Sequence, residues 1–184
     1  MRISLLILAL AAGSVAFAQD AEALIKAMQG AVNGQTAKLE RTADRMPSEE
    51  WGLVPGEGSR AFNDVVAHIV DAQNNTCGGL VGAGRMNPME GTGANKTALM
   101  AALKKSNEYC VQAAMETTAA NMYDPIQGYM GPTPRLATMY GNVQHSEDMY
   151  GQMAVYLRVA GHGPEPRQMG GKGKGGMKGK MKSK

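Results

Sequence analysis

The sequence has almost no strand signals, because β-branched residues do not recur with period two along its 184 residues. Ala, Met, Leu, Glu and Lys, which favour helices, are common instead. The chain also lacks a phosphate-binding loop, a nucleophile paired with a base, and a carboxylate pair whose spacing indicates acid–base catalysis. We therefore predict an all-α fold and find no catalytic set.

Only one long apolar run is present, from Ile3 to Ala12, and it is about half as long as a membrane span of roughly 20 residues. It follows a basic start and precedes small residues that end in Ala16-Phe17-Ala18. This order is typical of a secretory signal peptide that is cleaved after Ala18. No cysteine follows the cleavage site, so a lipid anchor is not indicated. We expect a signal peptide over 1–18 and a mature protein that is exported to the periplasm or the extracellular space.

Acidic residues are absent after Glu165, and residues 167–184 are rich in glycine and lysine. Such a segment buries too little apolar surface to offset the entropy of ordering it, so we predict a disordered tail. Without Arg2 and the six tail lysines, the chain has 12 basic and 16 acidic residues. The tail could bind anionic envelope components weakly through its charge, although a solubilising role is the simpler interpretation. The sequence leaves open whether two chains form a homodimer.

The remaining residues, 19–166, have the length of one domain with one core. Apolar residues at helical spacing, with Gly and Pro at the ends of each pattern, divide this domain into four amphipathic segments. Four such helices joined by loops predict a four-helix bundle. The predicted helices cover about 20–46, the segment from Ser59 as N-cap to about Cys77, about 95–122, and 134 or 135 to 159.

The chain has only two cysteines, Cys77 and Cys110, and they do not form a C-x-x-C pair. This spacing argues against a thiol–disulfide oxidoreductase. An even number of cysteines in an exported chain most simply indicates a disulfide, and two free thiols are the alternative. We expect a Cys77–Cys110 bridge that stabilises the fold by about 3–4 kcal/mol.

Three histidines are the remaining candidates for chemistry. His162 follows the last predicted helix, where we expect a solvated residue without a catalytic role. His68 and His145 lie at the edges of the apolar faces of the second and fourth helices, and Met149 follows His145 by one turn. A single histidine at such an edge is more often structural than a ligand. Two on facing helices favour a metal site, because bundles build such sites from inward side chains of different helices.

Three segments, FNDVVAHIVDAQNNTCGG, NKTALMAALKKSNEYCVQA and HSEDMYGQMAVYLRVAGHGPEP, resemble the DinB/YfiT-like superfamily. The resemblance extends from about Ala21 to Pro166. It implies a helical bundle whose cleft often holds zinc or nickel on three histidines, one from helix two and two from an H-x-x-x-H pair on helix four. By position, His68 and His145 match two of these ligands, and Met149 replaces the third. Relatives include thiol-dependent transferases and isomerases.

The replacement leaves three interpretations, because a thioether is a soft ligand that contributes little to zinc or nickel binding. The metal cleft could be degenerate, with metal weakly bound or absent and the bundle kept as a scaffold or binding module. Asp148 or Glu147 could supply a carboxylate in place of the third histidine. His68, His145 and Met149 could form a Cu(I) site. We expect a non-catalytic or binding protein. The alternative is a metal-dependent transferase or hydrolase that uses His68 and His145.

Overall fold

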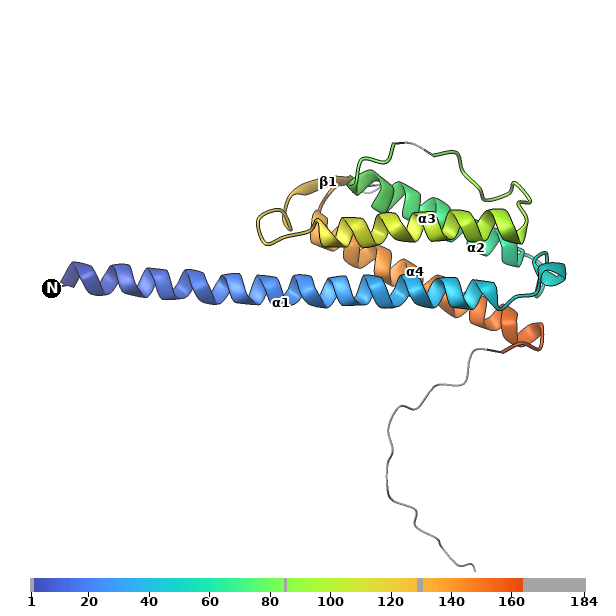
Figure 1. Cartoon of the computed structure of the whole chain (residues 1–184), viewed down its shortest axis with the longest axis horizontal. Helices are drawn as coiled ribbons and strands as arrows, with labels where there is room; N and C mark the ends of the chain where they lie inside the picture. Colours follow the sequence, from blue (N-terminus) through green and yellow to red (C-terminus); the bar gives the residue numbers. More distant parts are fainter. Residues whose placement is uncertain (1, 85, 129–130, 164–184) are drawn as a thin grey trace, which may run out of the picture.

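The computed structural model describes residues 2–84, 86–128 and 131–163, with side chains described from Asp20 onward. It confirms the all-α prediction (Figure 1). The helix α1 packs mainly against α3 and α4, and α2 packs against the same two helices from the other side. The helical elements are α1 (Arg2–Asp44), the 3-10 turn η1 (Ser48–Glu50), α2 (Phe62–Gln73), the π-helix η2 (Asn74–Gly78), α3 (Lys96–Met115) and α4 (Arg135–Val159).

The first helix, α1, covers both the predicted signal peptide and the predicted first helix of the domain, and its N-terminal part extends beyond the rest of the bundle (Figure 1). The signal peptide over 1–18 therefore stays a prediction from the sequence. The predicted tail, 167–184, lies outside the described residues. Among the helices of the described part, none combines the length and apolar composition that crossing a membrane requires.

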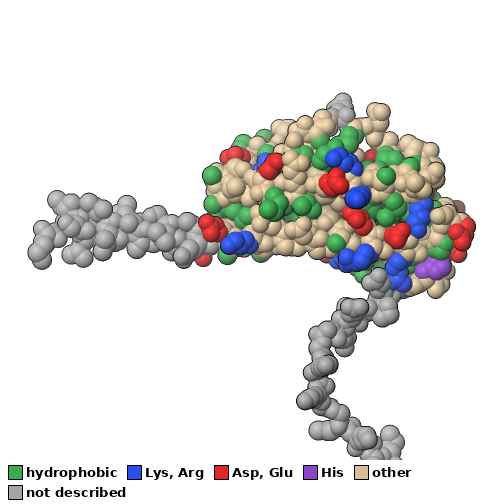
Figure 2. Space-filling view, in the orientation of Figure 1, with side chains coloured by type: hydrophobic (Ala, Val, Ile, Leu, Met, Phe, Trp, Pro, Cys, Tyr) green, Lys and Arg blue, Asp and Glu red, His purple; other side chains and the backbone are tan. Residues whose placement is uncertain are grey.

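The core is built where the four helices face one another. One apolar cluster includes Leu39 of α1, Phe62 of α2, Leu103 of α3 and Leu157 of α4. Trp51 closes this cluster at one end of the bundle, with its ring edge-on to Phe62 at a centroid distance of 5.4 Å. Figure 2 shows that acidic and basic side chains are interspersed over the face formed by α1 and α3, without a large patch of one sign.

Two predicted helix ends are wrong. The N-cap of α2 is Ala61, not Ser59, and no side chain caps this end. The N–H groups of Phe62 and Asn63 donate instead to backbone carbonyls of the preceding loop, which replaces a side-chain cap. The helix α3 begins after the N-cap Asn95, close to the predicted start, but it ends at Met115 rather than near residue 122.

The connection between α3 and α4 contains a β-hairpin that the sequence prediction missed. Strand β1 (Pro125–Gly128) pairs antiparallel with β2 (Gly131–Pro134), with Ile126 opposite Thr133. Four-residue strands that begin or end with proline lack the alternating β-branched pattern that identifies a strand. The hairpin leads directly into α4.

The predicted disulfide is present between Cys77 of η2 and Cys110 of α3. Both cysteines are fully buried, in a second apolar cluster that includes Val32, Ala113 and Met139. The bridge ties the π-helical turn to α3. It therefore fixes one wall of the region where α2 approaches α4.

Candidate functional site

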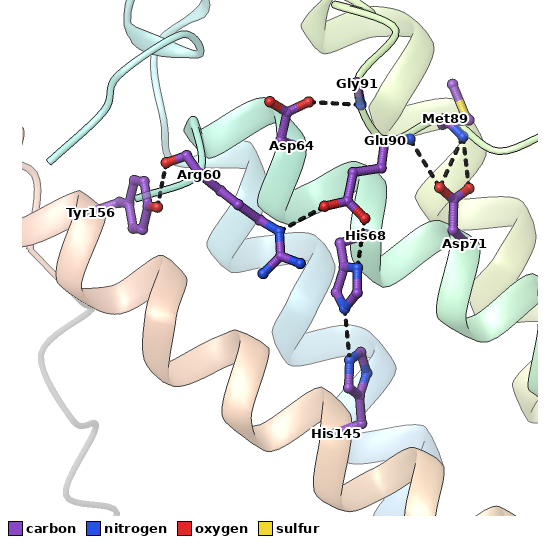
Figure 3. Close-up of polar contacts among 9 residues, drawn as sticks. All are labelled: Arg60, Asp64, His68, Asp71, Met89, Glu90, Gly91, His145 and Tyr156. Atoms are coloured by element: carbon purple, nitrogen blue, oxygen red, sulfur yellow. Dashed lines mark hydrogen bonds and ion pairs between the residues drawn. The ribbon is translucent and has the colours of Figure 1, made fainter. Parts of the chain in front are cut away.

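The structure brings His68 and His145 into contact, although 77 positions separate them in the sequence. Their Nε2 atoms are 3.2 Å apart, with His68 on α2 and His145 on α4 (Figure 3). Both side chains are half-buried. Each helix buries its apolar neighbours in the core, which leaves the imidazoles at the edge of the interface between α2 and α4.

A third group, Glu90, completes this contact, and the sequence reasoning missed it. Its Oε2 atom lies 2.8 Å from His68 Nδ1, and its Oε1 atom accepts a hydrogen bond of 2.6 Å from Arg60 Nε (Figure 3). The four side chains thus form a chain of contacts from Arg60 through Glu90 and His68 to His145. No sequence motif identifies Glu90, because it stands in a Gly-rich loop 22 positions after His68.

Two carboxylates of α2 hold that loop in place. Asp71 accepts hydrogen bonds from the backbone N–H groups of Met89 and Glu90, at 2.8 and 2.9 Å, and Asp64 accepts one from Gly91 at 3.1 Å (Figure 3). A carboxylate that accepts from backbone N–H groups forms charge-assisted hydrogen bonds, which are stronger than neutral ones. The anchoring therefore positions Glu90 against His68.

The protonation of the site follows from these contacts. Burial would raise the pKa of Glu90, but the hydrogen bonds and charges of His68 and Arg60 lower it overall. Burial lowers the pKa of His145, and the charges of His68 and Arg60 lower it further, against the opposing charge of Asp148. With Glu90 ionised, His68 Nδ1 donates, so a neutral His68 accepts at Nε2 and a neutral His145 donates to it.

The other predicted site residues do not join the two histidines as a set. Met149 is 7% exposed and belongs to the apolar core with Met153 and Leu157. Glu147 is exposed and forms an ion pair with Lys38, with Nζ 2.6 Å from Oε1. Asp148 is exposed and acts on His145 through its charge.

His162 lies away from this site and is exposed, in agreement with the prediction. Its Nε2 atom lies 2.7 Å from Glu50 Oε2, and its carbonyl accepts a hydrogen bond from Arg45. These contacts fasten the chain after α4 to the turn that contains η1. His162 therefore combines a solvated position with contacts at the surface.

The residues present supply only part of the metal site that the resemblance implies. Two nitrogens bound at about 2.0–2.1 Å to one tetrahedral zinc ion lie roughly 3.3–3.4 Å apart, close to the observed 3.2 Å. Glu90 on His68 Nδ1 also matches the carboxylate that often orients a ligating histidine. However, among the described residues no three His, Cys, Asp or Glu side chains are grouped so as to hold a metal ion. Two imidazoles and a buried thioether do not fit a three-nitrogen site.

A groove of about 610 Å³ opens beside His145. The π-helical turn and the hairpin form two of its walls, and the first half of α4 forms the third. Among the residues that the structure describes, His145 is the one titratable side chain in its wall, and the other polar side chains there are amides and hydroxyls. The lining residues are Ala72, Asn75, Thr76, Gly79, Ile126, Gln127, Thr133, Ala137, Thr138, Gly141, Asn142 and His145.

The fold resembles several solved structures. A DinB-like protein from Bacillus cereus is 20% identical, with a TM-score of 0.60 over 69% of this chain and 86% of that one. A DinB-like protein from Bacillus subtilis is 16% identical, with a TM-score of 0.61 over 76% and 95%. The mycothiol-dependent maleylpyruvate isomerase is 16% identical, with a TM-score of 0.58 over 73% and 67%. At these identities the likeness shows the fold alone.

Of the comparisons by sequence, the one with protein families gives a match. None of the curated proteins with which the sequence was compared matches it. The family model of the DinB superfamily matches residues 31–153, which include His68, His145, Met149 and both cysteines. The chain therefore belongs to the DinB superfamily.

Proposed function

We propose that this protein is an exported, non-catalytic binding module of the DinB fold, which holds a small uncharged ligand in the groove beside His145. The observation that carries the proposal is the groove itself. Its wall of amides, hydroxyls and methyl groups matches an uncharged ligand with a few hydrogen-bonding groups, because none of the described side chains that line it carries a fixed charge to neutralise an ionic one. Its volume of about 610 Å³ is within the usual range for small-molecule sites.

The histidine pair supports a binding role over a metal-dependent one. The facing nitrogens of His68 and His145 are 3.2 Å apart and satisfy each other, so the pair is complete without an ion. A catalytic zinc site uses three protein ligands and an open position. The buried thioether of Met149 is a poor third ligand for zinc or nickel.

The predicted export also argues against the thiol chemistry known from the family. The amino-terminal sequence has the order of a signal peptide, and reduced small thiols are a cytosolic resource. The mycothiol dependence of the similar isomerase therefore stays with that protein.

The second candidate is a metal-dependent transferase or hydrolase that uses His68 and His145. One observation favours it, namely the Glu90 carboxylate on His68 Nδ1, which would orient His68 Nε2 as a ligand. Zinc or nickel there would supply Lewis-acid chemistry. The exposed Asp148 would then have to approach His145 to complete the ligand set.

Metal content separates the two candidates. The chain is purified without a polyhistidine tag, and bound zinc, nickel and copper are measured by elemental analysis. We expect substoichiometric metal in the parent, and a gain of zinc or nickel in Met149→His that His68→Ala abolishes. Met115→His, at an exposed position on α3, is the matched control and should gain none. Stoichiometric metal in the parent that disappears in His68→Ala would favour the enzyme, and this arm does not depend on the folding of Met149→His.

Groove occupancy is tested with two glycines of α4. Gly141 lines the groove, Gly151 does not, and a Cβ atom at either position meets nothing within 4 Å. Benzamide serves as an uncharged probe, titrated into ¹⁵N-labelled chain while amide shifts are followed by NMR. We expect saturable shifts at Thr138 and Gly141 in the parent and in Gly151→Leu, and none in Gly141→Leu. Equal shifts in both leucine variants would contradict binding in the groove.

A further inference from the structure

Arg60 stands at the entrance to α2 and uses only part of its hydrogen-bonding capacity. Its Nε atom donates to Glu90 Oε1 at 2.6 Å, and its carbonyl accepts a 2.6 Å hydrogen bond from the Tyr156 hydroxyl. Figure 3 shows the two terminal nitrogens of the guanidinium pointing away from Glu90. Neither of them has a hydrogen-bond partner among the residues that the structure describes. Four N–H donors of one arginine are therefore open for a ligand.

Arg60 also lines a second hollow, of about 350 Å³, which we call the Arg60 cavity. Ser59 and Gln152 add a hydroxyl and a side-chain amide to its wall, whereas Pro55 and Val155 give it an apolar side. None of the described residues that line the Arg60 cavity has a carboxylate, and these residues are Pro55, Gly58, Ser59, Arg60, Gln152, Val155 and Tyr156. The cavity and the groove share no residue, because the cavity uses the end of α4 beyond His145 and the groove uses the beginning of that helix.

Tyr156 holds the arginine in place for this role. Its side chain is buried and its ring packs on Phe62 at a centroid distance of 5.8 Å. The hydroxyl reaches the Arg60 carbonyl from this fixed position, and Glu90 fixes the guanidinium at Nε. Tyr156 thus fixes the backbone of Arg60 and Glu90 holds the guanidinium at Nε, so less rotamer entropy is lost when the guanidinium binds a ligand.

We propose that the Arg60 cavity binds a small organic monocarboxylate. The carboxylate would lie against the terminal nitrogens of Arg60, which form a planar fork that matches its two oxygens. Ser59 and Gln152, which line the same cavity, would donate to the same group, and the apolar remainder of the ligand would pack against Pro55 and Val155. Glu90 already offsets the charge of Arg60. A monoanion held by hydrogen bonds therefore fits the cavity better than a dianion such as phosphate.

Benzoate is the probe for the test, with benzamide as its uncharged analogue and inorganic phosphate as the dianion. The full chain labelled with ¹⁵N is titrated, and the amide signals of Ser59 and the side-chain signals of Arg60 and Gln152 are followed by NMR. We expect saturable shifts with benzoate and none at these positions with benzamide or phosphate. Equal shifts with benzamide, or stronger ones with phosphate, would overturn the proposal. Because the groove test follows Gly141 and Thr138, failure of one proposal is distinguishable from failure of the other.

Two variants and a matched control locate the binding. Arg60→Gln should weaken benzoate binding about tenfold or more, because a charged bidentate contact is lost. Arg41→Gln removes the same charge from an exposed position on α1 and should leave the dissociation constant unchanged. Gln152→Glu retains Arg60 and its contact with Glu90 but places a competing carboxylate in the cavity, so it should abolish binding. Benzoate affinity within twofold of the parent in Arg60→Gln or Gln152→Glu, or equal losses in the two arginine variants, would overturn the site.

Discussion

Glu90 Oε2 lies 2.8 Å from His68 Nδ1, although the two residues come from a Gly-rich loop and from the middle of α2. This contact decides which nitrogen of His68 faces His145, and it turns two histidines at a core edge into an ordered pair. The order depends on the loop, because Asp71 holds the backbone of Glu90 in place. The candidate site is therefore a product of loop anchoring as much as of the bundle.

Replacing Glu90 with alanine should randomise the tautomer of His68. In the parent, the carboxylate favours a proton on Nδ1 and leaves Nε2 as an acceptor. Without it, both tautomers become available, and His145 loses a defined partner. The ¹⁵N shifts of the imidazole nitrogens, recorded on metal-free protein near pH 8, measure this directly. Glu57→Ala, at an exposed loop position, is the control. Parent-like nitrogen shifts in Glu90→Ala would show that the carboxylate does not set the tautomer.

His145 should make the fold less stable in weak acid. Burial lowers its pKa in the folded protein, with the charges of His68 and Arg60 adding to the effect and that of Asp148 opposing it. An unfolded chain binds the proton near pH 6.5, whereas the folded chain binds it only at lower pH. The free energy of unfolding should therefore fall as the pH drops below 6.5, until the lowered pKa is reached.

Urea unfolding of the metal-free chain between pH 8 and about pH 5 tests this window. His145→Asn should flatten the decline, and His162→Asn, which removes a histidine beyond the C-terminal end of α4, should retain it. Glu90 acts in a separate window, because its pKa is lowered from 4.5 and its stabilisation is lost only as the pH falls further. An equally steep decline above pH 5 in His145→Asn and the parent would refute the assignment.

Helical periodicity was sufficient to place His68 and His145 on the second and fourth helices, and cysteine counting was sufficient for the disulfide. The first inference depends on a local pattern, and the second depends on the number of cysteines. Met149 shows what helical periodicity alone does not predict. Spacing puts it on the same side of α4 as His145, but the structure buries it with Met153 and Leu157 in the core that Trp51 closes. How far the core extends along a helix depends on the helices packed against it. The periodicity of one helix contains no information about them.

Glu90 could not be predicted for a different reason. The path of its loop is decided by hydrogen bonds that backbone N–H groups donate to Asp64 and Asp71, and such contacts produce no periodic pattern in the sequence. The hairpin β1–β2 was not predicted because its prolines and glycines are typical of loops. The groove needs this hairpin and the π-helical turn together, so its shape was equally beyond sequence reasoning.

Asp71→Ala should release the loop without unfolding the bundle. The carboxylate accepts from the N–H groups of Met89 and Glu90, and its loss removes hydrogen bonds to a charged group, which stabilise by about 1.5–3 kcal/mol each. Hydrogen–deuterium exchange should accelerate at Met89 and Glu90 while α3 stays protected. Asp20→Ala removes the same charge from an exposed position on α1. It should leave both the stability of the fold and the exchange rates at Met89 and Glu90 unchanged. Unchanged protection at Met89 in Asp71→Ala would mean that other contacts hold the loop.

Removing the disulfide should lower the free energy of unfolding by about 3–4 kcal/mol, because Cys77 and Cys110 close a loop of 33 residues in the unfolded chain. The double variant Cys77→Ser and Cys110→Ser, compared with the parent in urea, measures this loss. Both sulfurs are fully buried, so dithiothreitol should reduce the bridge only at urea concentrations that unfold the parent. Non-reducing mass spectrometry of the parent should show no alkylatable thiol. Reduction in native buffer would show that the bridge does not resist exchange. An unchanged urea midpoint in the double variant would show that it does not stabilise the bundle.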